Sequence, residues 1–172
     1  MTLTITSHLG LASPPDGALD VLTDAFAEPP YGYDRARFER RLEQWSSYAE
    51  VPGFRTVTAH RDGQLVGIAW GWNSGVGSCA GLPGYRELYT RLEAKPWGSE
   101  LRGVEVVELG VARSERGTGV GRQLLDRLVS GGPGWLIAYA EAPAAQWYAQ
   151  RGWRRLGPLE GEPPLLVFAA PE

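Results

Sequence analysis

The stretch Val106–Leu125, VVELGVARSERGTGVGRQLL, decides the fold of this chain of 172 residues. Its apolar start predicts a strand, and its end predicts a helix because Val120, Leu124 and Leu128 recur at helical spacing. Between them stands the glycine-rich loop Arg116–Gly121, whose glycines let the backbone turn tightly and approach a ligand. The first amides of a helix have no partner inside it and attract anions. The segment therefore predicts a cradle for a pyrophosphate group.

The glycine spacing separates this loop from the two standard phosphate-binding motifs. A dinucleotide fingerprint requires G-x-G-x-x-G, whereas Gly117, Gly119 and Gly121 follow the spacing G-x-G-x-G. A P-loop requires Lys and then Ser or Thr after its last glycine, and here Arg122-Gln123 follows. The pattern R-x-x-G-x-G after a strand resembles instead the acyl-CoA-binding motif of the GNAT superfamily of N-acetyltransferases.

A second segment, Trp135–Trp153 (WLIAYAEAPAAQWYAQRGW), strengthens this resemblance. It predicts a strand, a turn, a short helix and a further strand. The family shows here a small residue, an aromatic-Tyr pair, and then Gly with an aromatic residue. The matching positions are Ala144, Trp147-Tyr148 and Gly152-Trp153. The chain departs from the family at Glu141, where the family has Asn, so that position does not carry over the family's cofactor contact.

Apolar periodicity and turn residues predict an alternation of strands and helices along the whole chain. Strands are expected near residues 3–5, 54–60, 65–72, 102–111, 135–140, after 152 and at 165–169. Helices are expected at 18–26, from 34 to beyond 45, at 85–94, 120–128 and 144–150, with a glycine-rich loop over 71–84. This order predicts a single α/β domain over residues 1–172 with helices on both faces of the sheet. The resemblance implies the GNAT fold, whose mixed, mostly antiparallel sheet has six to seven strands with splayed central strands.

Composition and charge exclude several classes of protein. The chain is 43% hydrophobic and 22% charged, as globular proteins are, and no long apolar run predicts a membrane span. The N-terminus does not resemble a signal peptide, and the single Cys79 forms no internal disulfide, so we expect a cytoplasmic protein. With only His8 and His60 beside that cysteine, no metal site is expected. The net charge of −3 disfavours nucleic-acid binding. The arginines within residues 35–41 are predicted to lie on a solvated face of a helix.

The resemblance implies that acetyl-CoA binds along the central strand and the glycine loop. Loop amides would bind its pyrophosphate, while the backbone of Leu109 and Val111 would pair with the pantetheine arm. A bulge near Gly110 is expected to free these edge groups and to leave a backbone N–H for the thioester oxygen. The expected cofactor-binding residues are Leu109, Gly110, Val111, Arg116, Gly117, Thr118, Gly119, Val120, Gly121 and Arg122.

Acetyl transfer needs a neutral amine and a proton for the departing thiolate. An alkylammonium group has a pKa near ~10, so a general base is useful. Glu105 and Glu108 are both candidates; on a regular strand they face opposite sides, unless a bulge between them brings them together. The family's commoner base position favours Glu105, and the alternative for each is an ion-paired or solvated glutamate. Tyr148 resembles the family's general acid, the alternative being a tyrosine that only packs.

Aromatic residues predict the acceptor site. Trp70 and Trp72 share one face of a strand, and Tyr31 and Tyr33 flank a glycine between two helices. Trp97 lies in the segment before the central strand, which shapes the acceptor site in the family. Core packing is the alternative for Trp70 and Trp72. An aromatic pocket suits an apolar amine, or a cation held by cation–π contact.

The resemblance therefore implies an N-acetyltransferase that moves an acetyl group from acetyl-CoA directly to a small-molecule primary amine within a ternary complex. The alternatives are a protein or peptide N-acetyltransferase and a non-catalytic acyl-CoA-binding module. A longer acyl group or a carrier-protein donor also stays open. The expected partner is the small-molecule acceptor, with neither nucleic acid nor membrane. The family also allows a homodimer, although no exposed apolar stripe predicts its interface.

Overall fold

Strands and helices alternate in the order that the sequence predicts. The computed structural model describes residues 1–75, 79, 81–130 and 132–172. Its strands are β1 (Leu3–Leu9), β2 (Arg55–Arg61), β3 (Gln64–Asn73), β4 (Val104–Val111), β5 (Gly134–Tyr139), β6 (Arg154–Leu159) and β7 (Leu165–Ala169). Its helices are α1 (Ala18–Phe26), α2 (Arg35–Glu43), α3 (Trp45–Ala49), α4 (Tyr85–Glu93), α5 (Val120–Leu128) and α6 (Pro143–Gln150). Residues 76–78 and 80 of the expected glycine-rich loop lie outside the described residues.

One predicted helix is divided in two. The apolar spacing of Phe38, Leu42 and Trp45 predicts a continuous helix, but Gln44 takes a non-helical conformation with φ −84° and ψ 4°. Helix α2 ends there, and α3 begins at the next residue. Both segments still place apolar residues on the sheet, because Phe38 and Trp45 are almost fully buried.

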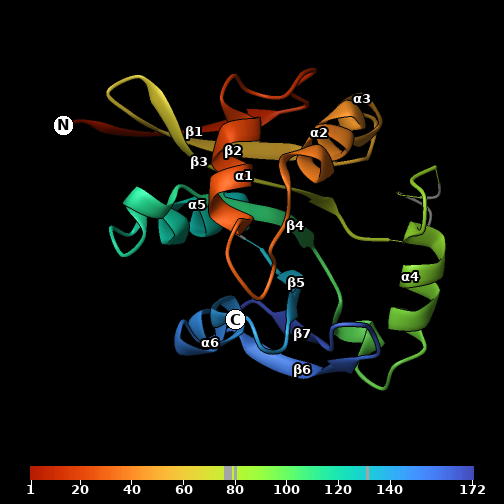
Figure 1. Ribbon diagram of the computed structural model, residues 1–172. Helices are drawn as coiled ribbons and strands as arrows, with labels where there is room; N and C mark the ends of the chain where they lie inside the picture. The colour runs from red at the N-terminus through yellow and green to blue at the C-terminus, as the bar shows by residue number, and fades with distance from the viewer. Residues whose placement is uncertain (76–78, 80, 131) are drawn as a thin grey trace.

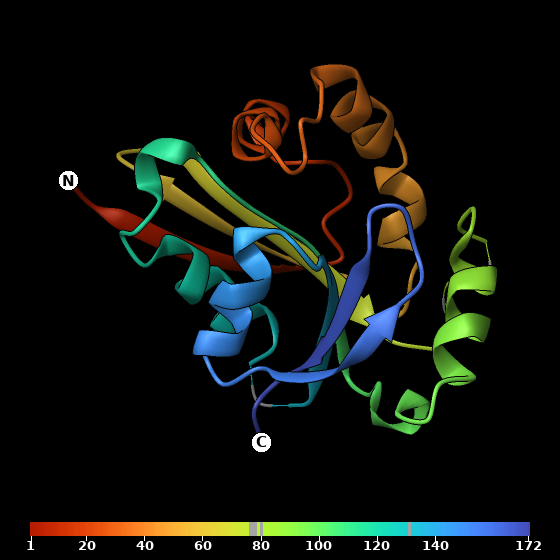
Figure 2. The ribbon, with the colours of Figure 1, turned by 60° about the horizontal axis from the view of Figure 1, so that its bottom comes forward.

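The seven strands form one sheet in the order β1-β2-β3-β4-β5-β7-β6. Only the β4–β5 pair is parallel, so the predicted mixed and mostly antiparallel sheet is confirmed. Figure 1 shows the path of the chain through this sheet. In Figure 2 the orange helices α1, α2 and α3 lie on one side of the sheet, and the teal and blue helices α5 and α6 lie on the other. Helices therefore cover both faces, as predicted.

The two central strands separate after a short region of contact. Strand β4 pairs with β5 only from Val104 to Val106, which face Gly134 to Leu136, although both strands continue beyond this point. The backbone of β4 beyond Val106 therefore has no strand partner on its β5 side. This is the predicted splay, and it opens the sheet at its centre.

A bulge on β4 lies at the point of separation. Across the other edge of β4, Trp70 pairs with Glu108 and Gly71 pairs with Val106, so Val107 is the extra residue. The expected bulge near Gly110 is thus wrong in position by three residues. Because of the bulge, Glu105 and Glu108 face the same side of the sheet, opposite Trp72 and Trp70 respectively.

Gly110 has a packing role instead. A Cβ atom at this position would lie 2.9 Å from Cδ2 of Leu22 on α1, so only glycine lets the helix approach β4 this closely. The contact brings the C-terminal end of α1 to the edge of the opening between β4 and β5.

The core has two layers, one on each face of the sheet. On the α1–α4 side, Trp45, Trp70, Trp72 and Trp135 are at most 2% exposed and form a large aromatic core. On the other side, the apolar stripe of α5 packs against β2, β3 and β4 with exposures of at most 1%. The stripe comprises Val120, Leu124, Leu125 and Leu128. The helix periodicity read from the sequence is therefore confirmed, and it fixes the glycine loop at the end of a rigid element.

Glu105 is buried inside the aromatic core. The residue is only 5% exposed. Its Oε2 accepts a hydrogen bond from the Tyr89 hydroxyl and another, of 3.0 Å, from Trp72 Nε1. Burial raises the pKa of Glu105 to about 7, although these two hydrogen bonds act in the opposite direction.

This burial predicts a stability that depends on pH. The ordinary pKa is 4.5, so between pH 4.5 and about 7 the folded protein holds a proton that the unfolded chain has released. The free energy of unfolding should therefore fall by roughly 3 kcal/mol as the pH rises through this window. Glu105→Gln keeps an acceptor for Tyr89 and Trp72 but does not titrate. Urea denaturation should show the variant gaining stability relative to wild type from about pH 5 to about pH 8; a constant difference would contradict the prediction.

Candidate active site

Two cavities meet where β4 and β5 separate. The larger, which we call the glycine-loop cavity, has a volume of about 580 Å³ and lies between the end of α1, the loop before α5 and the start of α6. The smaller, which we call the aromatic cavity, has a volume of about 230 Å³ and lies between α2, β4, β5 and α6. Their shared wall consists of Phe26, Tyr31, Leu109, Ala144 and Tyr148. The two cavities are therefore adjacent.

The glycine loop presents unpartnered backbone amides to the larger cavity. Gly117 and Gly119 have φ of 78° and 88°, in the left-handed region that favours glycine, and a Cβ atom on either would meet nothing within 4 Å. Gly119 caps α5 without a side-chain hydrogen bond. Among the described residues, the amides from Val120 to Arg122 have no backbone acceptor, and the first bond is from Gln123 N to Gly119 O at 3.1 Å. The start of α5 is thus suited to an anion.

Ion pairs and hydrogen bonds fix the position of the glycine-rich loop. Glu115 accepts from Arg61 Nε at 2.6 Å and Nη2 at 2.7 Å, and this pair holds the pKa of Glu115 below its ordinary value. The Thr118 hydroxyl donates to the Glu115 carbonyl at 2.7 Å. Arg116 donates to Glu28 at 2.9 Å and to the Ala25 carbonyl at 2.9 Å. The loop is therefore tied to both β2 and the end of α1.

Most of the predicted cofactor-binding residues line the glycine-loop cavity. These are Leu109, Val111, Arg116, Gly117, Gly119, Gly121 and Arg122. Three others do not line it, each for a local reason. Gly110 faces α1, the Thr118 hydroxyl supports the loop, and the Val120 side chain is fully buried beneath it. Glu141, at the position of the family's Asn, is exposed.

Comparison with known families decides between the interpretations of this loop. The model of the acetyltransferase (GNAT) family matches residues 19–153, which include both the glycine loop and Tyr148. The chain belongs to the GNAT family. It is an acetyl-CoA-dependent N-acetyltransferase, and the prediction made from the R-x-x-G-x-G motif is confirmed. The acceptor is not determined by this membership.

Solved structures support the fold. The paia N-acetyltransferase of Thermoplasma acidophilum, solved with coenzyme A, is 11% identical with a TM-score of 0.66, and all of both chains is covered. The acetyltransferase yncA of Salmonella typhimurium, solved with acetyl-CoA, is 13% identical with a TM-score of 0.63; the match covers 99% of this chain and 94% of yncA. A histone acetyltransferase HPA2-related protein of Corynebacterium glutamicum is 21% identical with a TM-score of 0.62, covering 99% and 97%. At these identities the likeness shows the fold alone. No curated protein sequence matches the chain significantly.

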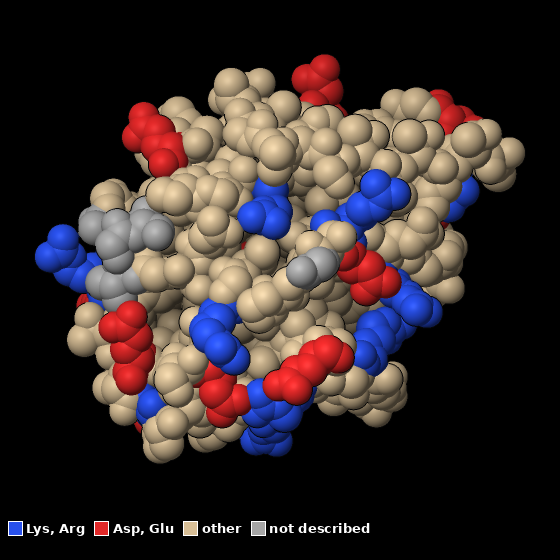
Figure 3. Space-filling model, turned by 180° about the vertical axis from the view of Figure 1, so that it is seen from behind, with Lys and Arg blue, Asp and Glu red and all other residues tan. Residues whose placement is uncertain are grey.

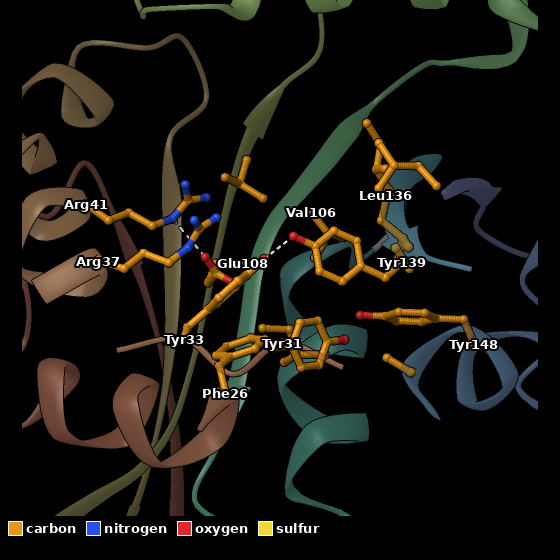
Figure 4. Close-up of a pocket in the computed structure, with 16 residues that line it drawn as sticks. Phe26, Tyr31, Tyr33, Arg37, Arg41, Val106, Glu108, Leu136, Tyr139 and Tyr148 are labelled. Atoms are coloured by element: carbon orange, nitrogen blue, oxygen red, sulfur yellow. Dashed lines mark hydrogen bonds and ion pairs between the residues drawn. The ribbon is translucent and has the colours of Figure 1, made fainter. Parts of the chain in front are cut away.

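Glu108 lies in the aromatic cavity of this GNAT enzyme. Its Oε2 is 2.8 Å from Arg41 Nε, and Figure 4 shows this pair at the centre of the site, with Arg37 beside it. Burial raises the pKa of Glu108 above its ordinary value, and Arg41 and then Arg37 limit the rise. A carboxylate with a raised pKa is a stronger base than an exposed glutamate, and this one lines the aromatic cavity.

Tyr148 lies in the wall between the two cavities. It is 7% exposed, and Figure 4 shows its ring extending from α6 toward the site. Among the described residues its hydroxyl has no hydrogen-bond partner. Burial, with smaller contributions from Tyr31 and Glu108, raises the pKa of Tyr148, so the hydroxyl remains a proton donor.

Tyr31 and Tyr33, which the sequence predicts to bind the acceptor, both line the aromatic cavity. The Tyr33 hydroxyl is hydrogen-bonded to that of Tyr139, and the ring of Tyr31 stacks on Tyr139 with centroids 5.4 Å apart. These contacts attach the loop after α1 to the end of β5. Tyr139 was not predicted, because a tyrosine at a strand end carries no signal that the neighbouring strand has turned away.

Three tryptophans predicted to bind the acceptor line neither cavity among the residues that the structure describes. Trp70 and Trp72 share a strand face, as expected, but α3 and α4 cover that face, and both are fully buried. Trp97 packs against Gly157, where a Cβ would lie 2.4 Å from its Nε1. Glu105 also lines neither cavity, because it lies with Trp72 in the core. The stated alternative for Trp70 and Trp72, core packing, applies to both.

Two arginines in the cavity were missed by the sequence analysis. Both line the aromatic cavity, in a stretch predicted to be a solvated face. Arg37 is exposed, as that prediction has it, whereas Arg41 is partly buried. Their spacing of four residues, which places them on one helix face, was the available signal.

The charged side chains on the surface do not form a patch of one sign on the face shown in Figure 3. On this face, acidic and basic side chains are interspersed. In the described part of the chain, no helix is long and apolar enough to cross a membrane. No three described His, Cys, Asp or Glu residues gather where they could hold a metal ion.

Proposed function

We propose that this enzyme transfers the acetyl group of acetyl-CoA directly to the primary amine of a small molecule, with both bound at once. One observation carries the proposal: a small aromatic cavity that contains the partly buried carboxylate of Glu108 shares a wall, which includes Tyr148, with the glycine-loop cavity. Its volume of about 230 Å³ is below the range of about 300–1,000 Å³ typical of drug-sized ligands, which favours a compact acceptor over a peptide.

Acetyl-CoA would occupy the glycine-loop cavity. The amides at the start of α5 would bind its pyrophosphate, with Arg122 adding positive charge. The edge of β4 from Leu109 to Val111, which has no partner on its β5 side, would pair with the pantetheine arm as an added strand. The thioester would then lie at the wall that the two cavities share, and a free backbone N–H of β4 would stabilise its oxygen as that becomes negative.

Glu108 and Tyr148 would move the protons. Glu108 is proposed as the base rather than Glu105, since only Glu108 of the two lines the aromatic cavity. It would take a proton from the acceptor ammonium, and the neutral nitrogen would attack the thioester carbon. The C–S bond then breaks, and Tyr148 would donate its proton to the departing thiolate. The nitrogen would lose its second proton to solvent as the amide forms, and Tyr148 would regain a proton from solvent. Tyr31 and Tyr33 would enclose the acceptor.

Thiol release from acetyl-CoA tests the proposal. Purified protein is incubated with acetyl-CoA and single small amines, and free coenzyme A is measured over time. Release that depends on one class of small amine, with acetylated product in the mass spectrum, is the expected result. Binding of acetyl-CoA without release by any small amine, but with acetylation of a peptide, would replace the small-molecule acceptor by a protein. Binding without any transfer would favour a non-catalytic module.

A further inference from the structure

Two arginines of α2 reach into the aromatic cavity. Arg37 and Arg41 are four residues apart, so they share one face of the helix. Figure 4 shows both guanidinium groups extending toward Glu108 from the same side. The charged residues that line this cavity are these two arginines and Glu108. The cavity therefore carries one more positive than negative charge.

Arg41 has an ion-pair partner, whereas Arg37 has none among the residues that the structure describes. The Nε of Arg41 is 2.8 Å from Glu108, but no described carboxylate forms an ion pair with Arg37. The guanidinium carbon of Arg37 instead lies 3.8 Å from the ring centroid of Tyr33, a cation–π contact that orients it at the cavity. The backbone amide of Arg37 donates to the capping Asp34 at 2.9 Å, which fixes this turn of the helix. Arg37 is thus an exposed side chain at the cavity, oriented by Tyr33 and without an ion-pair partner among the described residues.

The phosphates of acetyl-CoA do not supply this partner. Arg37 lines the aromatic cavity and is absent from the glycine-loop cavity, where Arg116 and Arg122 lie beside the α5 amides. Tyr31 and Tyr148 form part of the wall between the two. The charge of Arg37 therefore faces the acceptor.

The geometry points to an acceptor that carries a carboxylate as well as its amine, an amino acid or a molecule of that kind. Its amine lies near Glu108, where the cavities meet, and its carboxylate binds Arg37. The planar guanidinium matches a carboxylate with two parallel hydrogen bonds, and one excess charge matches one carboxylate. A polycationic amine would instead bring positive charge against Arg37. This inference rests on the proposed function and names its substrate class.

Matched pairs of acceptors test the inference. Each amino acid is compared with the amine that lacks only its carboxylate: γ-aminobutyrate with propylamine, and phenylalanine with phenethylamine. Wild-type enzyme should favour the acid of the productive pair by about 10–100-fold in kcat/KM, the range expected for a charge-assisted contact. Arg37→Gln should abolish this preference by raising KM for the acid far more than KM for the plain amine. Arg37→Lys should retain part of it.

Arg40→Gln is the matched control, because Arg40 lies on the same helix but does not line the cavity. The Arg40→Gln variant should prefer the acid over the plain amine as strongly as wild type does. Because all variants are compared on the same pair of acceptors, the difference in basicity between the two amines cancels. A wild-type enzyme that favours the plain amines, or an Arg37→Gln variant that loses both activities equally, would overturn the inference while leaving small-molecule acetylation intact. Failure to acetylate any small amine would overturn the proposed function and the inference with it.

Discussion

Tyr148→Phe should lower kcat by roughly 10²–10⁴-fold, the range of a general acid, while acetyl-CoA binds as tightly as before. The substitution removes only the hydroxyl, and the ring still fills the wall between the cavities, where the residue is 7% exposed. Without the hydroxyl, the thiolate must leave unprotonated or take its proton from water. Isothermal titration with acetyl-CoA and steady-state kinetics with a productive amine separate binding from turnover.

Tyr48→Phe is the control for this variant. Tyr48 is also a buried tyrosine, 3% exposed, but it lies in the aromatic core and lines neither cavity. Its loss should change kcat little. If Tyr148→Phe turned over as fast as wild type, Tyr148 would only pack between the cavities.

Glu108→Gln should lower kcat/KM by about 10²–10⁴-fold near neutral pH. The variant has no base in the aromatic cavity, so it depends on amine molecules that are already neutral in solution. The deficit should therefore shrink as the pH approaches the amine's pKa, near ~10. In wild type, activity should fall as the pH decreases through the pKa of Glu108, which burial places above its ordinary value. Rate profiles over pH for both proteins check this prediction.

Glu105→Gln distinguishes the two glutamates. Its carboxylate accepts from Trp72 and Tyr89 in the core, so we expect a change in stability with pH and little change in kcat/KM. A large loss of turnover in Glu105→Gln, together with an active Glu108→Gln, would reverse the assignment. Because Glu108→Gln leaves Arg41 without its partner, acetyl-CoA binding must be shown to persist before its kinetics are interpreted.

Local patterns predicted the fold well, because the features that identify it are local. The α5 stripe and the glycine loop each depend on residues within one or two turns of chain. The break at Gln44 was missed, since the apolar spacing on its two sides remains compatible with one helix.

The site was harder to predict because it depends on contacts between distant segments. The bulge at Val107 follows from the register of β4 against β3, which no single strand encodes. Alternation placed Trp70 and Trp72 on one face but could not show that α3 and α4 cover it. For the same reason, the sequence could not reveal that Arg37 and Arg41 line the aromatic cavity.

Initial-rate kinetics with both substrates varied test the central claim most directly, that acetyl passes straight across the wall between two occupied cavities. The only cysteine, Cys79, is buried in the core and lines neither cavity, so it is not placed to form an acetyl-enzyme. We expect double-reciprocal lines that intersect, with coenzyme A released only when an amine is present. Parallel lines, with one equivalent of coenzyme A released before any amine is added, would contradict direct transfer.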